Sequence, residues 1–454
     1  MAAEDGAGSG SPTTVAGHCD PRFARVREVF GEHFARGEEI GAAFAVYLDG
    51  EPVVDLWGGV ADRRTGRPWE RGTPVLAYSC TKAVTATAVH LLAERGLLDL
   101  TAPVARVWPE FADRGKERIT VEHLLTHQAG LPAIEEPVPV EEFEDQAAIA
   151  ARLARQEPLW EPGTAHGYHA LTYGFLLGEV VRRVSGKSVG ELVAAEIAGP
   201  AGLELWVGAP DDVAARAARL SAGERARPGA PAADSTGAAA SAVPDTAASA
   251  DTAASAVPGG VSPAPAGGSA GAEPRGSAHG ASPAGGGGQG LVHEMARAAL
   301  DPASLMNRAL GNPPLHKLAG GANHPVALRA GWPAMGAVTT ARGLAGFYRE
   351  LIGGRILRPE TLRDAVRPRV AGPDRVLIVD SSFGLGYMRP SMTYLTPARG
   401  ARTAFGHTGM GGSLGLGDLE HGLAMAYTMN RMAGAVSGSL RAYRLAEAVY
   451  ESLG

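Results

Sequence analysis

The stretch SCTKAVTATAVHLLAERGLLDL, residues 79–100, decides the fold and contains the first chemically suggestive motif. Its helix-forming residues predict a helix that ends at Gly96, in the left-handed conformation common at helix C-termini. Ser79 then lies at the helix N-terminus, and Lys82 lies one turn further along the same face. A serine hydroxyl becomes a good nucleophile only when a base removes its proton. A desolvated lysine at this spacing therefore predicts nucleophilic catalysis.

Two further motifs accompany this pair, which matters because S-x-x-K alone arises by chance in long chains. Tyr168 follows a Pro-Gly turn and precedes a predicted helix, so its phenol or phenolate is placed to shuttle the serine proton. His407-Thr408-Gly409 begins a short glycine-dense strand that can approach a substrate closely. Its imidazole can donate to an oxyanion or a carboxylate. Together the three motifs predict an acyl-serine enzyme.

The order and spacing of these motifs resemble those of class C β-lactamases and family VIII carboxylesterases. Both belong to the superfamily of serine β-lactamases and penicillin-binding proteins. The segments 119–132, 334–348 and 424–432 support the same resemblance, which covers nearly all of the chain outside its low-complexity stretch. The resemblance implies a β-lactamase/transpeptidase-like fold and a serine hydrolase activity.

The resemblance also implies a role for each motif residue. Ser79 is the nucleophile, Lys82 and Tyr168 are the base pair, and His407 stands where β-lactamases carry a lysine. The oxyanion hole and the adjacent substrate contacts are assigned to Ser79, Met410, Thr408 and Gly409. The chain departs from the β-lactamase pattern at His407 and at Ala170, which replaces an asparagine. Both departures argue against efficient β-lactam hydrolysis and favour the esterase branch.

We therefore expect an esterase-like serine hydrolase that cleaves small carboxylic esters or amides through an acyl-serine intermediate, with no cofactor and no metal. One alternative is an acyltransferase that passes the same acyl group to an alcohol or amine. Another is a β-lactamase or D-amino-acid peptidase. A catalytically silent ligand-binding homologue belongs to a different class, and the intact set of Ser79, Lys82 and Tyr168 argues against it.

Three other patterns allow competing interpretations. Residues 411–415 match the G-x-S-x-G nucleophile elbow, but a strand-like segment follows Ser413 where the elbow requires a helix. His123 and His127 have the i, i+4 spacing of zinc ligands but lack the intervening glutamate of a zinc protease. Cys80 is interpreted as a small buried residue, with a reactive thiol as the alternative.

Composition excludes further classes of protein. The net charge of −6 and a sequence pI near 6.1 give no basic field for phosphates, so no nucleic-acid partner is expected. No run reaches the roughly 18 apolar residues of a membrane span. The small, polar and acidic start is unlike a secretory signal, and two cysteines are too few for a disulfide framework. A cytoplasmic location is expected.

The chain is predicted to form one two-lobed domain over residues 19–454, preceded by a disordered tail at residues 1–18. An Ala/Gly/Pro/Ser-rich segment, residues 221–290, interrupts the domain as a disordered insertion, because it has too few large apolar residues to offset its chain entropy. We expect its deletion to leave folding of the rest intact.

The predicted fold class is α+β, with an antiparallel sheet flanked by helices and a separate helical lobe. Strand-like runs at 41–62 are joined by the hairpin dipeptide Asp49-Gly50. Further strands are predicted at 376–379, 383–388, 412–420 and 422–430. Predicted helices lie at 21–39, 120–128, 144–156, 171–185, 190–196, 339–352 and 437–453. Because strands cluster near both ends of the chain, they are expected to share one sheet.

Overall fold

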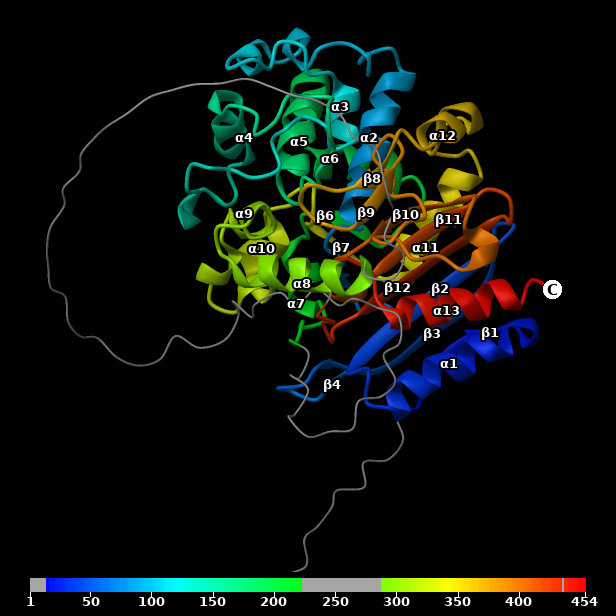
Figure 1. The fold of residues 1–454 in the computed structure, drawn as a ribbon. Coiled ribbons are helices and arrows are strands. Elements are labelled where there is room, and N and C mark those ends of the chain that lie inside the picture. The colour runs from blue at the N-terminus through cyan, green and yellow to red at the C-terminus, as the bar shows by residue number, and fades with distance from the viewer. Residues whose placement is uncertain (1–13, 223–286, 435–436) are drawn as a thin grey trace, which may run out of the picture.

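A seven-stranded antiparallel sheet joins strands from both ends of the chain (Figure 1). The structure is a computed structural model that describes residues 14–222, 287–434 and 437–454. The strand order is β1 (Ala16–Cys19), β3 (Glu51–Asp62), β2 (Gly41–Leu48), β12 (Leu423–Met429), β11 (Leu414–Asp418) and β10 (Ala404–Thr408), with β4 (Arg67–Pro68) paired to β3. The predicted α+β class and the sharing of one sheet are confirmed.

The central strand β2 is buried on both faces, since alternate side chains of a strand point to opposite sides. Phe44 and Val46 contribute to the apolar cluster that also contains residues of α1 (Ala24–Ala35) and α13 (Leu440–Glu451). Ala43, Ala45 and Tyr47 contribute to the cluster that contains residues of α11 (Ala341–Ile352) and α2 (Thr81–Glu94). Helices therefore cover both faces of the sheet, as in a three-layer arrangement.

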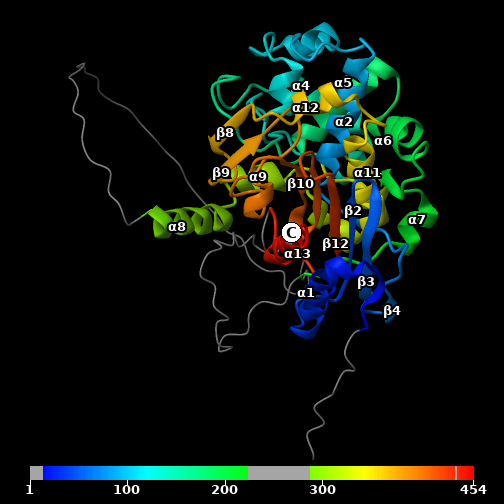
Figure 2. The ribbon, with the colours of Figure 1, turned by 90° about the vertical axis from the view of Figure 1, so that its right-hand side faces the viewer.

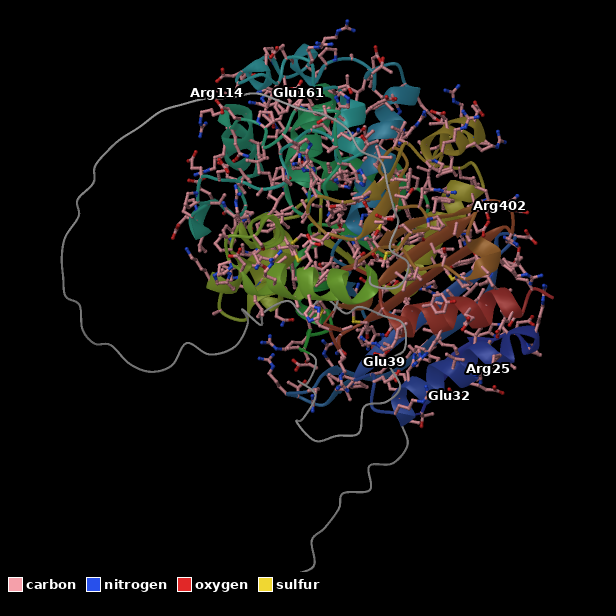
Figure 3. All side chains as sticks on the ribbon, in the orientation of Figure 1. Arg25, Glu32, Glu39, Arg114, Glu161 and Arg402 are labelled. Atoms are coloured by element: carbon pink, nitrogen blue, oxygen red, sulfur yellow. The ribbon has the colours of Figure 1, made fainter. Side chains whose placement is uncertain are left out.

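Helices from the two chain ends share one face of the sheet. Helices α1 (Ala24–Ala35) and α13 (Leu440–Glu451) pack against each other there, and α11 (Ala341–Ile352) packs on the opposite face (Figure 2). Helix α1 is amphipathic: Arg25 pairs with Glu32 at 3.1 Å on its exposed side, and Val26 and Phe30 are buried (Figure 3).

The helical lobe is built around α2 (Thr81–Glu94), which packs on α5 (Thr172–Ser185). The other helices of the middle region are α3 (Val121–Leu125), α4 (Gln146–Arg155), α6 (Val189–Val193), α7 (Asp211–Arg216), α8 (Gly287–Leu300), α9 (Leu305–Gly311), α10 (Pro325–Arg329) and α12 (Pro359–Ala365). Two small sheets connect the lobes, one of β5 (Val75–Leu76), β7 (Ala337–Thr339) and β6 (Leu205–Val207), the other of β8 (Val370–Pro373) and β9 (Asp380–Phe383).

The structure differs from the expected tail and insertion at their boundaries. Strand β1 lies within the last residues of the tail expected at 1–18, because backbone pairing with β3 requires no large side chains. Ser221 pairs with Arg431, and α8 begins at Gly287, so both ends of the expected insertion 221–290 are ordered. Residues 1–13 and 223–286 lie outside the described part of the chain.

Two of the predicted strands are wrong in whole or in part. Residues 376–379 form a turn rather than a strand, because the Asp374 side chain accepts hydrogen bonds from the backbone N–H groups of Val376 and Leu377 at 2.9 Å each. Of residues 383–388, only Phe383 belongs to a strand, and Met388 makes isolated bridges to Phe383 and Gly406. The apolar runs were therefore correct indicators of burial but not of conformation.

Replacement of the buried residue His33 is expected to stabilise the protein. His33 of α1 is fully buried, and neither ring nitrogen has a partner among the described residues. Burial lowers its pKa from 6.5 to about 4, and neighbouring arginines add to this. His33→Leu should raise the free energy of unfolding by about 1–2 kcal/mol at pH 7. Because the folded-state pKa is depressed, the wild type loses stability as the pH falls from about 6.5 towards 4, and the variant escapes this loss.

Urea unfolding at pH 7 and pH 5 measures both effects. The matched control is His90→Leu, because the ring of His90 is equally buried but its Nε2 bonds the Leu385 carbonyl at 2.9 Å. This control should destabilise the protein. A lower free energy of unfolding for His33→Leu would contradict the prediction, because it would mean that the contacts of the ring stabilise the protein by more than its burial destabilises it.

Candidate active site

Ser79 lies in a turn between strand β5, which belongs to the three-stranded sheet, and helix α2. Strand β5 leads into this turn, where Ala77 N donates to the Ala337 carbonyl at 2.8 Å. Tyr78 has a positive φ of 48°, an uncommon backbone conformation that directs the chain into α2. Ser79 is partly exposed, whereas Lys82 is fully buried. A reactant from solvent therefore meets the hydroxyl before the amine.

The amine of Lys82 has three neighbours and no carboxylate. Its Nζ lies 3.2 Å from Ser79 Oγ, 2.7 Å from the Ala170 carbonyl and 3.0 Å from the Ala334 carbonyl. Burial lowers the pKa of Lys82 well below its usual value. A neutral amine has two N–H donors and one lone pair. Since the two carbonyls accept two N–H groups, the third hydrogen-bonding position of Nζ faces the Ser79 hydroxyl, and in the neutral amine that position is the lone pair.

The phenol of Tyr168 completes this group. Burial raises its pKa, while the nearby Ser79 side chain acts in the opposite direction. Lys82 Nζ lies 4.7 Å from the centre of the Tyr168 ring. Because the pKa is raised, the phenol keeps its proton at neutral pH, and the phenolate alternative is not supported. The nearby Tyr173 instead directs its hydroxyl to the Lys82 carbonyl at 3.4 Å.

His407 on β10 lies beside Tyr168, with the ring centres 6.0 Å apart. Its Nδ1 is 2.7 Å from the Thr408 carbonyl, and a carbonyl only accepts, so Nδ1 carries the proton. Burial lowers the pKa of His407 to about 3. Its Nε2 is buried and has no partner among the described residues. The expected donor is thus an uncharged ring that offers a lone pair to the site.

The segment after His407 brings Gly409, the residue before Met410, against the turn that leads to Ser79. Met410 opens the short 3-10 segment Met410–Gly412, and the first N–H groups of such a segment have no partner within it. A Cβ on Gly409 would lie 2.1 Å from Ser413 Oγ and 2.3 Å from the Ala77 carbonyl. The hydroxyl of Thr408 instead bonds Ser437 Oγ at 2.6 Å, so its part in this site is its carbonyl, which orients His407.

The competing motifs are not supported by their surroundings. Ser413 Oγ donates to the Ala77 carbonyl at 2.9 Å, and strand β11 follows it rather than a helix. Burial raises the pKa of Cys80 to about 12, which removes the reactive-thiol alternative. His123 caps α3 together with Thr120, as predicted, and His127 lies beyond the end of that helix.

No metal-like cluster involves these histidines. His127 Nδ1 accepts a hydrogen bond from the backbone N–H of His169 at 3.1 Å. Within residues 14–222, 287–434 and 437–454, no three His, Cys, Asp or Glu side chains are grouped so that they could hold a metal ion. In the same part of the chain, none of the helices has the length and apolar character needed to cross a membrane.

Sequence reasoning missed the groups that hold the amine and the tyrosine. The Ala170 and Ala334 carbonyls are main-chain atoms, so no residue type marks them. The Asp374 carboxylate, which accepts the backbone N–H of Tyr168 at 2.9 Å, is distant in sequence and lies two residues before the segment predicted as a strand. Its only sequence signal is the Pro373-Asp374 dipeptide, which is typical of turns.

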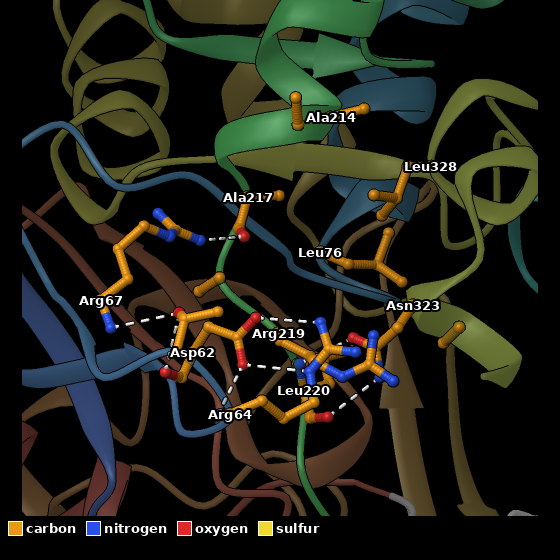
Figure 4. Close-up of a pocket in the computed structure, with 14 residues that line it drawn as sticks. Asp62, Arg64, Arg67, Leu76, Ala214, Ala217, Arg219, Leu220, Asn323 and Leu328 are labelled. Carbon is orange, nitrogen blue, oxygen red and sulfur yellow. Dashed lines mark hydrogen bonds and ion pairs between the residues drawn. The ribbon is translucent and has the colours of Figure 1, made fainter.

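A separate cavity of about 520 Å³ contains none of the motif residues (Figure 4). Its charged lining consists of Asp62, Arg64, Arg67 and Arg219, and Arg64 pairs with Asp62 at 3.0 Å. Leu76, three residues before Ser79, is its closest lining residue in sequence. We place the candidate site at Ser79 rather than in this cavity because only there do a hydroxyl and a buried amine meet.

The fold and this group of residues define a serine hydrolase in which the serine lies one helical turn before a buried lysine. A family model for beta-lactamases matches residues 26–450, and the chain belongs to that family. The chain is 34% identical to the esterase/beta-lactamase LipL of Mycobacterium tuberculosis, over 92% of this chain and 83% of that protein.

Solved structures agree with this assignment. A family VIII carboxylesterase matches with a TM-score of 0.74 and 32% identity, covering 97% of this chain and 100% of the other. A penicillin-binding protein homologue from Caulobacter crescentus matches with a TM-score of 0.73 and 34% identity, at the same coverage. The predicted superfamily, fold class and serine hydrolase function are confirmed.

The close approach at Gly409 yields a prediction. Gly409→Ala should force β10 away from the Ser79 turn, because the added methyl group meets the Ala77 carbonyl, which is backbone. We expect esterase activity to fall at least about tenfold, since small displacements of reacting groups are costly. Stability should fall by about 1–3 kcal/mol. Activity on p-nitrophenyl butyrate and thermal unfolding measure the two effects.

Gly31→Ala is the control. Gly31 lies inside α1, where a Cβ would meet only Val15 at 4.0 Å. This change should leave activity unaltered and raise stability by up to about 1 kcal/mol. Full activity in Gly409→Ala would show that the strand and the turn do not need their close contact.

Proposed function

We propose that this protein is an esterase that cleaves small carboxylic esters through an acyl-Ser79 intermediate. The observation that carries the proposal is the buried Lys82 amine, which bonds two carbonyls and lies 3.2 Å from the serine hydroxyl, where the lone pair of the neutral amine would lie. Membership of the beta-lactamase family and the likeness to proteins named as esterases support it.

Acylation begins when Lys82 Nζ takes the proton of Ser79 Oγ as the oxygen attacks the ester carbonyl carbon. The carbonyl oxygen becomes an oxyanion, which the backbone N–H groups of Ser79 and Met410 stabilise. The tetrahedral intermediate collapses with breakage of the bond to the leaving alcohol. The alcohol receives a proton by way of Tyr168 and Lys82, and the acyl group stays on Ser79.

Deacylation repeats these steps with water as the nucleophile. Lys82 Nζ takes the proton of the attacking water, with Tyr168 relaying protons between them. The bond between the acyl carbon and Ser79 Oγ then breaks, the carboxylic acid is released, and the proton returns to Ser79 Oγ. An alcohol in place of water gives transfer of the acyl group, which is the acyltransferase alternative. Product analysis with water and methanol in competition separates hydrolysis from transfer, since only transfer forms the methyl ester.

The uncharged ring of His407 favours substrates without a carboxylate near that position. A carboxylate placed there would meet a buried lone pair instead of a cation, and burial of an unpaired charge is costly. Neutral esters carry no such penalty. The site therefore favours neutral esters over penicillin-like compounds and over peptides that end in a free carboxylate.

If Lys82 is the base, its removal should lower the esterase activity, and the activity of the wild type should depend on pH. Ser79→Ala and Lys82→Met should each lower kcat/KM for p-nitrophenyl butyrate by at least about 100-fold. In the wild type, kcat/KM should fall at low pH, because protonation of Lys82 removes the lone pair. Because burial lowers the pKa of Lys82, this fall should come at a lower pH than an ordinary lysine would give. Steady-state rates between pH 5 and 9 measure the profile.

Circular dichroism and thermal unfolding establish that both variants are folded, and Lys187→Met, which alters a half-buried lysine paired with Glu196, serves as the control. Equal activity of the wild type and Ser79→Ala would place the nucleophile elsewhere. Mass spectrometry of the trapped acyl-enzyme identifies the acylated residue directly.

The role of His407 predicts a change of substrate preference. His407→Lys should raise the rate on mono-p-nitrophenyl glutarate relative to p-nitrophenyl valerate at least about fivefold, because the ammonium pairs with the terminal carboxylate. His407→Leu, which has neither charge nor lone pair, should not raise this ratio. The ratio of the two kcat/KM values is the measurement, and an unchanged ratio in His407→Lys would remove His407 from the acyl-binding region.

A further inference from the structure

The Asp374 carboxylate is the most heavily hydrogen-bonded side chain next to the proposed catalytic group. It is only 2% exposed. Its Oδ1 accepts the backbone N–H groups of Tyr168, Val376 and Leu377, each at 2.9 Å. Its Oδ2 accepts the Ser381 hydroxyl at 2.8 Å. Such convergence of donors on an anion makes strong, charge-assisted hydrogen bonds.

These bonds connect Tyr168 to a turn more than two hundred positions later in the chain. Residues 374–379 form this turn, which we call the Asp374 turn. Arg375 N donates to the His166 carbonyl at 3.2 Å, so the turn holds the tyrosine segment at two points of its backbone. Because both contacts are to backbone atoms, they fix the position of the segment whatever its side chains are.

The Asp374 turn joins β8 to β9, and β9 also contacts the ring of Tyr168. Ser381 and Phe383 are two residues apart on β9, so their side chains point to the same face. Ser381 bonds Asp374, and Phe383 lies parallel to the Tyr168 ring, with 6.2 Å between centres and 11° between planes. His166 Nε2 lies 3.0 Å from Ser381 Oγ and continues the chain of bonds.

We propose that Asp374 is a positioning residue that holds the Tyr168 hydroxyl against Ser79 by anchoring the tyrosine backbone. This inference rests on the proposed function, since it gives Asp374 no contact with substrate and lets it act only through the phenol. The carboxylate is required as an anion, because one oxygen serves three N–H donors while the other accepts a hydroxyl.

Variants that remove different numbers of the four hydrogen bonds to Asp374 should lower the activity to different extents. Asp374→Asn keeps the shape and one acceptor oxygen but loses the charge, so kcat for p-nitrophenyl butyrate should fall about tenfold with little change in KM. Ser381→Ala removes one bond of four and should cost no more than about twofold. Asp374→Ala leaves three N–H groups unpaired and should cost most, in activity and in stability.

A double-mutant cycle with Tyr168→Phe distinguishes positioning from general support of the fold. If Asp374 acts through the phenol, Asp374→Asn should lower kcat about tenfold in the wild type but less than about twofold in the Tyr168→Phe background. If Asp374 only supports the fold, the same loss appears in both backgrounds. Thermal unfolding of all four proteins checks that each is folded at the assay temperature.

Asp418→Asn is the matched control. Asp418 is a fully buried carboxylate at the far end of β11 that also accepts several hydrogen bonds, among them the Tyr450 hydroxyl at 2.6 Å. Loss of this charge should affect stability and leave kcat unchanged.

The outcomes separate the two proposals. Additive losses, or an unaltered kcat in Asp374→Asn, overturn the role of Asp374 while the acyl-Ser79 mechanism stands. Full activity of Tyr168→Phe overturns the part given to the phenol, and with it the role of Asp374. A loss confined to the background with an intact tyrosine supports the inference.

Discussion

The burial of one amine is the constraint on which the rest of the site depends. Lys82 sits in the interior with two carbonyls and a hydroxyl for partners, and no carboxylate balances a positive charge there. A charged amine in that place is costly to desolvate, so the structure favours its neutral form. In the proposed mechanism, the fold thereby converts a residue that is normally a surface cation into a base. Residues far apart in the sequence, at 170 and 334, are brought together to do this.

Burial of the Lys82 amine costs free energy, and hydrogen bonds from the neighbouring residues of α2 hold the surrounding segments in place. Thr81 and Thr85, on the same side of α2 as Lys82, bond the segment around Ala334: Thr81 Oγ1 accepts Ala337 N at 2.9 Å, and Thr85 Oγ1 donates to the Pro333 carbonyl at 2.6 Å. Cys80 contributes a thiol contact of 3.3 Å to the His407 carbonyl. The first turn of α2 therefore fastens two distant segments around the amine. This explains why small and hydroxyl-bearing residues stand next to the serine and lysine.

Local patterns in the sequence were enough to predict most elements of the fold. The Asp49-Gly50 hairpin has both residues at positive φ, as the dipeptide indicates, and the cap of α3 pairs Thr120 with His123. The sharing of one sheet by the two chain ends also followed from the order of the strands. By contrast, the apolar residues of the Asp374 turn predicted a strand, because a side chain that captures backbone N–H groups is invisible to periodicity. The tautomer of His407 was equally out of reach, since it is set by a carbonyl and not by a residue type.

The pairing of β2 with β12 has a consequence for how the chain acquires its structure. Leu48 of the first hairpin lies opposite Leu423, close to the other end of the chain. While the protein is being synthesised, the hydrogen-bonding edge of β2 has no partner until almost the last strand has emerged. An apolar edge left open for that long invites pairing with other chains, and closing so distant a contact is slow. We expect the nascent chain, more than the finished enzyme, to be the form that depends on molecular chaperones.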